Sequence, residues 1–542
     1  MPVALQVNGS PVQGNDETSS LLAFLRDELG ICSVKDGCSP QGQCGCCTVL
    51  VDGEPRVACV TPLRRMAGRH ITTIEGLPPE TSTRWSEAFA ATGASQCGFC
   101  SPGIILRLVA EAAKAAPQPT QALLAHLCRC TGWLPILDAF EQVVEVAVAV
   151  AAPVSSRPAR DLPGARRRAE LEGHVRQRIG AEVALGQGPF ADDEAPTDAL
   201  VAVPDGEGGW VVGENLAEAR RLAGKVQGRR NTRTPAPPVS VPEGSWDLVL
   251  QTSWVEPAYL ETDASWCVPG GEPASPAGNG GAFGAKTNSP VAAAARMLAD
   301  RHGRAVRVLY SREDSVRFGP KRAPLAAGID RARGRVVIHV ARTAGIAERL
   351  LAGLGHGGNP LVSELDVEIH EVDVAGPPTS LAPRGAGWAE GVVLRAGLLG
   401  ATEAVTQPGG GRARVGLVEG VFHVDVDAGD PLDTVVLRSY CVGAVHMGAS
   451  WVSSEMLGVD TDGTVLDLTV RSFGVLRACD MAPVDLRVWP NGDGGNVYSA
   501  STLPLPRTDP LAVSDAVFAA TAAAVWAAQG WPGVWPTRLG LR

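Results

Sequence analysis

The residues best suited to chemistry in this chain are its cysteines, because ten of the thirteen stand before residue 131. These ten are Cys32, Cys38, Cys44, Cys46, Cys47, Cys59, Cys97, Cys100, Cys128 and Cys130. They are most dense in GCSPQGQCGCCTVLVDG at residues 37–53, where glycines separate them. Clustered thiolates in a reducing compartment bind metal more often than they form disulfides. The sequence therefore indicates metal binding by the N-terminal part of the chain.

The first cysteine set is spaced by five, two and eleven residues and consists of Cys38, Cys44, Cys47 and Cys59. This spacing resembles that of plant-type ferredoxins, in which four thiolates complete the two tetrahedral irons of a [2Fe-2S] cluster. The usual first gap is four residues, and Cys46 offers a further thiol within the loop. We expect Cys32 and Cys46 not to be ligands. A zinc site and a cluster of reactive thiols are the alternatives.

Short elements must position this first set. Alternating residues around Asn8-Gly9 predict a hairpin. The segment 19–30, SSLLAFLRDELG, predicts a helix with Ser19 or Thr18 as its N-cap. We expect strands at Thr48–Val51, Arg56–Val60 and Ile71–Ile74. Glycines within the cysteine loop let the backbone approach a small inorganic group and turn its N–H groups inward; they are Gly37, Gly42 and Gly45.

The second cysteine set lies in QCGFCSPG and CRCTGW and consists of Cys97, Cys100, Cys128 and Cys130. We expect helices around it at Ser101–Ala115, Gln121–Leu127 and Ile136–Val148, the first of them opened by Ser101-Pro102. A CxxC pair followed by a CxC pair could by itself bind zinc, although a CxC spacing is uncommon in zinc fingers.

Both motifs, in this order, resemble those of the molybdenum hydroxylases, the family of xanthine dehydrogenase and aldehyde oxidase. The resemblance covers residues 1 to about 150. It implies a β-grasp, plant-type [2Fe-2S] domain at 1–76 and a helical [2Fe-2S]-binding domain at 77–150. It also implies that the second set holds the cluster nearer the molybdenum cofactor, and that Gln96 contacts the pterin.

The remainder of the chain is expected to be a linker at 151–167, rich in Pro, Ala and Arg, followed by a mixed α/β region at 168–542. The segment 247–268 looks like paired strands. GNGGAFGAK resembles the family's GGxFGxK loop, and APRGAGWAEG resembles its RGxG loop. The resemblance implies that the cofactor side is lined by Gly281, Phe283, Gly284 and Arg384. As a whole, we expect an α+β multidomain protein.

This C-terminal region is shorter than the family's molybdenum subunit. In relatives, one stretch carries a glutamine next to the metal, and this chain has almost none of it. Relatives also have a GQG stretch that wraps the pterin dinucleotide, and this stretch is missing after Arg384. Where relatives carry a GxGE glutamate as general base, this chain has Leu503, and Asp509 is the nearest carboxylate. General-base catalysis contributes about 10²–10⁴-fold in rate, so this loss weighs against hydroxylase activity. Molybdopterin and molybdenum are therefore left as an open alternative.

The amino-acid composition limits the possible partners and cellular location of the protein. The chain has 542 residues, 45% of them hydrophobic, and a formal net charge of −10. This length allows several domains and a large core. The acidic balance argues against nucleic acid or an anionic membrane as a main partner. No apolar run reaches the roughly 18 residues of a membrane span, and the start lacks a signal-peptide pattern. We expect a cytoplasmic protein.

Three functional hypotheses follow. In the first, the chain relays electrons through two [2Fe-2S] clusters, while partner chains supply a FAD subunit together with a complete molybdenum subunit. In the second, the chain itself holds molybdopterin and hydroxylates N-heterocycles or aldehydes. In the third, it is a non-catalytic scaffold whose clusters only stabilise the fold.

Overall fold

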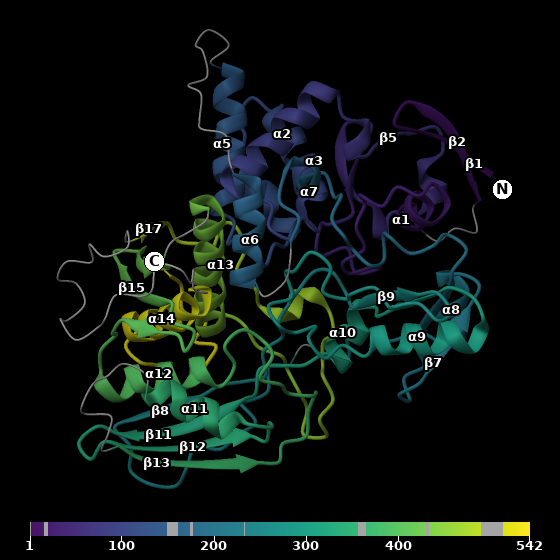
Figure 1. Ribbon diagram of the computed structural model, residues 1–542. Coiled ribbons are helices and arrows are strands. Elements are labelled where there is room, and N and C mark those ends of the chain that lie inside the picture. The colour runs from purple at the N-terminus through teal and green to yellow at the C-terminus, as the bar shows by residue number, and fades with distance from the viewer. Residues whose placement is uncertain are drawn as a thin grey trace.

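The computed structural model describes residues 2–15, 20–148, 161–173, 177–231, 233–355, 365–429, 433–488 and 513–541. The purple and blue N-terminal part packs above a larger teal-to-yellow remainder (Figure 1). Sheets and helices alternate through both parts, which confirms the expected α+β multidomain class. Leu503, Asp509 and the first ten residues of the expected linker lie outside the described residues.

The first unit is a five-stranded sheet in the order β2-β1-β5-β3-β4. Its strands are β1 (Pro2–Val7), β2 (Ser10–Asn15), β3 (Thr48–Val51), β4 (Glu54–Val57) and β5 (His70–Thr72). The hairpin predicted around Asn8-Gly9 is confirmed, and β1 pairs in parallel with β5. β3 has the predicted bounds, whereas β4 begins two residues before the prediction and ends in a 3-10 turn.

The helix predicted in the first unit is shorter than expected. It comprises α1 (Leu21–Ala23) and a continuing π-helical segment, Phe24–Glu28. Ser20 is the N-cap, because its side chain accepts a hydrogen bond from the Ala23 N–H, and the predicted caps Ser19 and Thr18 lie outside the described residues. Leu21, Leu22 and Leu25 of this segment are buried in the core of the first unit.

Four α-helices form the second unit, namely α2 (Pro79–Thr92), α3 (Ser101–Ala112), α4 (Pro119–Ala122) and α5 (Leu134–Val148). α2 packs on α5, where the ring centroids of Trp85 and Phe140 lie 6.1 Å apart. α3 packs on β3 of the first unit. The loops that carry the two cysteine sets therefore meet where these units join.

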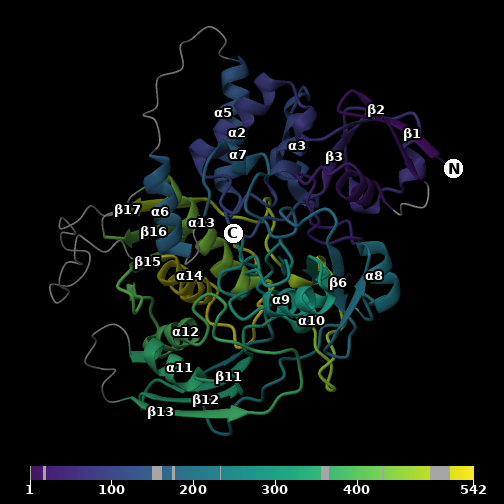
Figure 2. The same ribbon diagram turned by 45° about the vertical axis from the view of Figure 1, so that its right-hand side comes forward.

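The remainder contains three four-stranded sheets in the described residues, ordered β7-β6-β10-β9, β13-β12-β11-β8 and β14-β15-β16-β17. The first has strands β6 (Leu200–Pro204), β7 (Trp210–Gly213), β9 (Ala264–Cys267) and β10 (Val306–Leu309), with helices α8 (Leu216–Ala223), α9 (Val291–His302) and α10 (Arg312–Phe318). The second has strands β8 (Leu248–Gln251), β11 (Leu325–Asp330), β12 (Arg335–Ala341) and β13 (Asp366–Val372), with α11 (Ile346–Gly355) and α12 (Trp388–Leu399) over one face (Figure 2).

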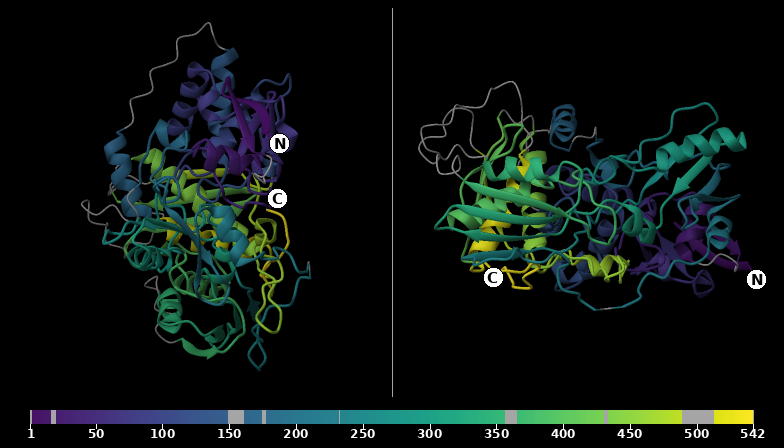
Figure 3. Two further views of the ribbon diagram at one scale, coloured as in Figure 1. Left: turned by 90° about the vertical axis from the view of Figure 1, so that its right-hand side faces the viewer. Right: turned by 90° about the horizontal axis from the view of Figure 1, so that it is seen from below.

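The third sheet has strands β14 (Val405–Thr406), β15 (Arg412–Val418), β16 (Val421–Asp427) and β17 (Val484–Val488). Beside it lie the buried helices α13 (Thr434–Ser453) and α14 (Ser514–Ala528), which pack on each other. β1 and α14 lie toward opposite ends of the molecule (Figure 1; Figure 3, right). Among the described helices, none is long and apolar enough to span a bilayer.

One sequence prediction in this part is wrong. The segment 247–268 does not form a strand pair, because β8 and β9 belong to different sheets. The last residues of the expected linker, 162–167, begin helix α6 (Leu162–Gly173) and are at least partly exposed except for Ala165. Ala165 and Ala169 of α6 pack against Tyr440 of α13, so burial of small residues stabilises a helix that has no long apolar stripe.

Candidate metal centre

The second cysteine set is formed by two loops that precede helices. Cys97 and Cys100 lead into α3, and Cys128 and Cys130 lie shortly before α5; all four are buried. The Sγ atoms of Cys97 and Cys130 are 3.6 Å apart. Hydrogen bonding with Cys128 raises the pKa of Cys100, and hydrogen bonding with Cys100 lowers the pKa of Cys128 to about 7. The four thiols thus form two pairs.

This pairing fits a two-iron cluster. Two thiolates on one tetrahedral metal, at metal–sulfur distances of about 2.3 Å, lie about 3.8 Å apart. A [2Fe-2S] cluster needs two such pairs, one at each iron. Within the ranges that the structure describes, no three His, Cys, Asp or Glu side chains converge on a single metal ion. The ligand role of these cysteines remains a prediction.

The second set is enclosed by close backbone contacts from the C-terminal region. A Cβ added at Gly281 would stand 2.9 Å from the Sγ of Cys97 and 3.3 Å from that of Cys130. A Cβ at Gly443 of α13 would stand 1.8 Å from the carbonyl oxygen of Cys130. Neither site has room for a larger side chain, so both glycines are required for the observed packing.

Two amides fasten the same loops. The Gln96 side-chain amide donates to the Cys130 carbonyl (2.9 Å) and to Ser439 Oγ of α13 (2.8 Å). The Asn279 amide donates to the Cys97 carbonyl at 3.0 Å. Gln96 therefore supports the cysteine loop, and its predicted contact with a pterin remains a prediction. Asn279 and Gly443 were missed by sequence reasoning, although Asn279 directly precedes the GGAFGAK motif.

The first cysteine set is wrapped by its own loop. Cys38 Sγ accepts hydrogen bonds from the N–H groups of Gln43 and Cys44, both at 3.4 Å, and Cys47 Sγ accepts one from the Cys59 N–H at 3.4 Å. Hydrogen bonding with Cys44 and Cys59 lowers the pKa of Cys38. The structure thus brings the four predicted thiols together, with backbone N–H groups directed at sulfur. Such N–H groups stabilise thiolate charge.

Cys46 occupies the space between the two sets. It is fully buried. A hydrogen bond with Cys44 lowers its pKa, but burial and the neighbouring thiols, Cys97 among them, raise the pKa overall. A Cβ at Gly103 of α3 would stand 2.4 Å from the carbonyl oxygen of Gly45, so α3 closes directly on this loop. Cys32 is only partly buried, and the prediction that neither residue is a ligand remains open.

The residues predicted to line the molybdenum side also come together. The Arg384 N–H donates to the Phe283 carbonyl at 2.9 Å, and the guanidinium carbon lies 4.4 Å from the Phe283 ring centroid. A Cβ added at Gly284 would stand 1.8 Å from the Ala382 carbonyl oxygen. Gly281 lies against the cysteines, as described above. The two glycine-rich loops therefore touch each other instead of framing an open groove.

A pterin does not fit between these loops. The cavity beside Phe283 and Arg384 has a volume of about 30 Å³, far below the roughly 300–1,000 Å³ of pockets that bind small molecules. Arg129 and Glu455 form a buried bidentate ion pair across it, at 2.5 and 2.8 Å. Burial lowers the pKa of Arg384, whose Nη1 has no hydrogen-bond partner among the described residues. The described residues therefore hold no pterin-sized space at this position.

Comparison with known proteins agrees with this geometry. Residues 73–141 match the family model described as a [2Fe-2S] binding domain. The chain is 39% identical over 150 residues to one subunit of the nicotinate dehydrogenase of Pseudomonas putida, a match that covers 26% of this chain and 94% of that subunit. It is also 39% identical over 155 residues to the xanthine dehydrogenase of Drosophila pseudoobscura pseudoobscura, covering 25% of this chain but only 11% of that enzyme.

The fold extends this likeness over the whole chain. The aldehyde oxidoreductase of Desulfovibrio desulfuricans matches with a TM-score of 0.65 at 14% identity, covering 97% of each chain. The chain thus combines a [2Fe-2S] binding domain at residues 73–141 with the fold of that aldehyde oxidoreductase. The chain belongs to the molybdenum hydroxylase family, which includes xanthine dehydrogenase and aldehyde oxidoreductase.

Proposed function

We propose that this chain relays electrons through two [2Fe-2S] clusters within a larger molybdenum- and flavin-containing oxidoreductase. The first cluster would be held by Cys38, Cys44, Cys47 and Cys59, and the second by Cys97, Cys100, Cys128 and Cys130. A bound [2Fe-2S] cluster supplies one-electron chemistry at a potential set by its protein surroundings. The observation that carries the proposal is that two buried four-thiol sets adjoin each other across a single packed junction.

The chain's own residues exclude water and fix the thiols. Backbone N–H groups at Gln43, Cys44 and Cys59 donate to sulfur and favour the thiolate form. Gln96 and Asn279 hold the backbone of the second set. Rigid ligands that are already in place limit reorganisation when charge arrives. These roles support a relay more directly than a catalytic pocket.

Partner chains are part of the proposal. Two of the relatives are named as subunits, one of nicotinate dehydrogenase and the other the xanthine dehydrogenase iron-sulfur-binding subunit of Escherichia coli O157:H7. By this likeness we expect this chain to act in the cytoplasm with a FAD subunit, and with a complete molybdenum subunit that carries the hydroxylation chemistry. The contact between the Phe283 and Arg384 loops weighs against the alternative of a self-sufficient hydroxylase.

The test is a stepwise anaerobic reduction of the purified chain, followed by electron paramagnetic resonance. Two signals that appear at different potentials, and that disappear reversibly on reoxidation, support the relay. One signal only, or none after iron and sulfide have been supplied, rejects it. Affinity purification from the native cell with mass spectrometry tests the partners, because a relay requires the co-purified chains to include a flavoprotein or a molybdenum-containing chain.

A further inference from the structure

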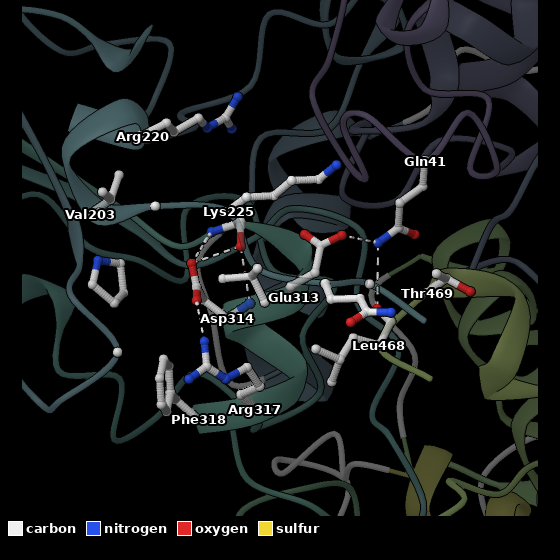
Figure 4. A pocket seen from close by; sticks show the side chains of 18 of the residues that line it. Gln41, Val203, Arg220, Lys225, Glu313, Asp314, Arg317, Phe318, Leu468 and Thr469 are labelled. Atoms are coloured by element: carbon white, nitrogen blue, oxygen red, sulfur yellow. Dashed lines mark hydrogen bonds and ion pairs between the residues drawn. The ribbon is translucent and has the colours of Figure 1, made fainter. Parts of the chain in front are cut away.

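A cleft of about 1420 Å³ opens beside the first cysteine loop and has no role in the relay described above. Its walls come from that loop, from α8 and the loop after it, from α10, and from residues 463–469 (Figure 4). Ligand pockets for small molecules commonly enclose about 300–1,000 Å³. The cleft is therefore large enough for a ligand of nucleotide size.

The acidic groups in the cleft are already engaged. Glu313 accepts a hydrogen bond from the Gln41 amide at 2.8 Å. Asp314 caps α10 through Ser311 and lies 3.6 Å from Arg317. Within the described part of the chain, only Asp314 has a cationic partner; Glu313 and the cleft-lining Asp205 keep their charge, held by an amide and by backbone N–H groups.

The basic groups are less engaged. Lys225 is exposed, extends into the cleft in Figure 4, and has no ion pair or side-chain hydrogen bond with any described residue. The nearest carboxylate to Arg220, that of Asp36, is 3.7 Å away, and the Arg220 side chain remains 43% exposed. A free ammonium and a weakly paired guanidinium on one wall favour an anion, and phosphate in particular.

The remaining residues that line the cleft form a surface against which a flat aromatic ring can pack. Val226, Val465 and Leu468 contribute apolar surface, and the Gln41–Glu313 pair offers polar atoms at one edge. Ala217 of α8 is exposed to the same space. An apolar wall with a few polar groups at its margin is typical of sites for heteroaromatic ligands.

We propose that this cleft binds a phosphorylated heteroaromatic ligand of the nucleotide class. The phosphate lies at Lys225 and Arg220, and the ring lies against the apolar wall near Leu468. Cys59 lines the same cleft, so the ring stacks close to the first cysteine set. Binding does not depend on the relay, because no cysteine contributes to the phosphate end.

Flavin mononucleotide is the probe, since its ring, its phosphate and its fluorescence are measured together. Titration of the full chain is expected to give saturable quenching, with riboflavin and inorganic phosphate each binding at least about tenfold more weakly. Lys225→Glu is expected to weaken binding by about tenfold or more, because it places a carboxylate against the phosphate. Thr464→Trp is expected to weaken it similarly, because Thr464 lines the cleft beside Val465 at the ring end.

The matched control is Arg301→Glu, the same charge change at an exposed position of α9 outside the cleft, which should leave binding unchanged. If Arg301→Glu and Lys225→Glu lost affinity for flavin mononucleotide equally, the loss would come from the net charge of the protein, and the site would be overturned. Riboflavin binding as tightly as flavin mononucleotide would overturn the phosphate end. The ring site would be overturned if inorganic phosphate competed at the same concentration as flavin mononucleotide and Thr464→Trp bound the flavin normally.

Discussion

Gly281 and Cys97 are separated by so little space that a single methyl group added to the glycine would lie 2.9 Å from the cysteine sulfur. Gly281 also has φ +82°, a left-handed conformation that side chains disfavour. One residue of the C-terminal region thus fixes the position of a thiol in the N-terminal region. This contact explains why the divergent C-terminal region still packs closely on the cysteine loops.

Gly281→Ala is therefore expected to displace Cys97 and to abolish the paramagnetic signal of the second cluster while the first survives. Iron content should fall by about half, since each [2Fe-2S] cluster carries two irons. The control is Gly270→Ala, because Gly270 has a similar φ of +68° but no atom near its added Cβ. Equal loss in both variants would show that backbone strain, and not the contact with Cys97, is responsible.

Cys46→Ala should retain the first cluster, whereas Cys44→Ala and Cys47→Ala should lose it. The reason is that Cys44 and Cys47 keep the two-residue gap of the ferredoxin pattern, which Cys46 does not. Visible absorbance and electron paramagnetic resonance of the three variants check this. Loss of the signal in Cys46→Ala, with Cys44→Ala unaffected, would mean that the ligands are assigned in the wrong register.

Glu390→Gln should destabilise the fold by about 3–5 kcal/mol, because it leaves the buried guanidinium of Arg322 without its charged partner. The two side chains are 4% and 6% exposed and lie 2.7 Å apart. Glu214→Gln, which breaks the exposed pair with Arg304, should cost about 0–1 kcal/mol. Urea denaturation of both variants gives the comparison, and equal free energies of unfolding would contradict it.

Stability should fall in mild acid through His446. Burial lowers the pKa of His446 from 6.5 to about 4, so the unfolded chain binds the proton more readily than the folded one. The stability that neutral His446 contributes is fully present above pH 6.5 and declines as the pH falls. Below about pH 4 the free energy of unfolding has fallen by about 3 kcal/mol in total. His446→Gln, which can still donate to the Leu476 carbonyl, should flatten this decline in urea midpoints between pH 7 and 4.5. An unchanged slope would assign the decline to other groups.

The sequence anticipated what depends on local spacing. The hairpin at Asn8-Gly9 could be inferred from its turn residues. Cysteines within one motif cannot lie far apart, but the meeting of Cys97 and Cys100 with Cys128 and Cys130 was implied only by family resemblance. Partners distant in the chain were harder to infer. Alternation in 247–268 fits two strands equally well whether they pair together or belong to separate sheets, and α6 depends on burial of Ala165 against Tyr440. That Phe283 and Arg384 lie in one region could be predicted only from the family resemblance.

The most direct test is to measure iron, acid-labile sulfide, zinc and molybdenum on the purified chain, together with the paramagnetic signals of its reduced form. We expect about four irons and four sulfides per chain, in two distinguishable signals, with molybdenum absent. Zinc in place of iron, or iron sufficient for one cluster only, would contradict the relay. Stoichiometric molybdenum with bound pterin would contradict the conclusion that the Phe283 and Arg384 loops leave no room for that cofactor.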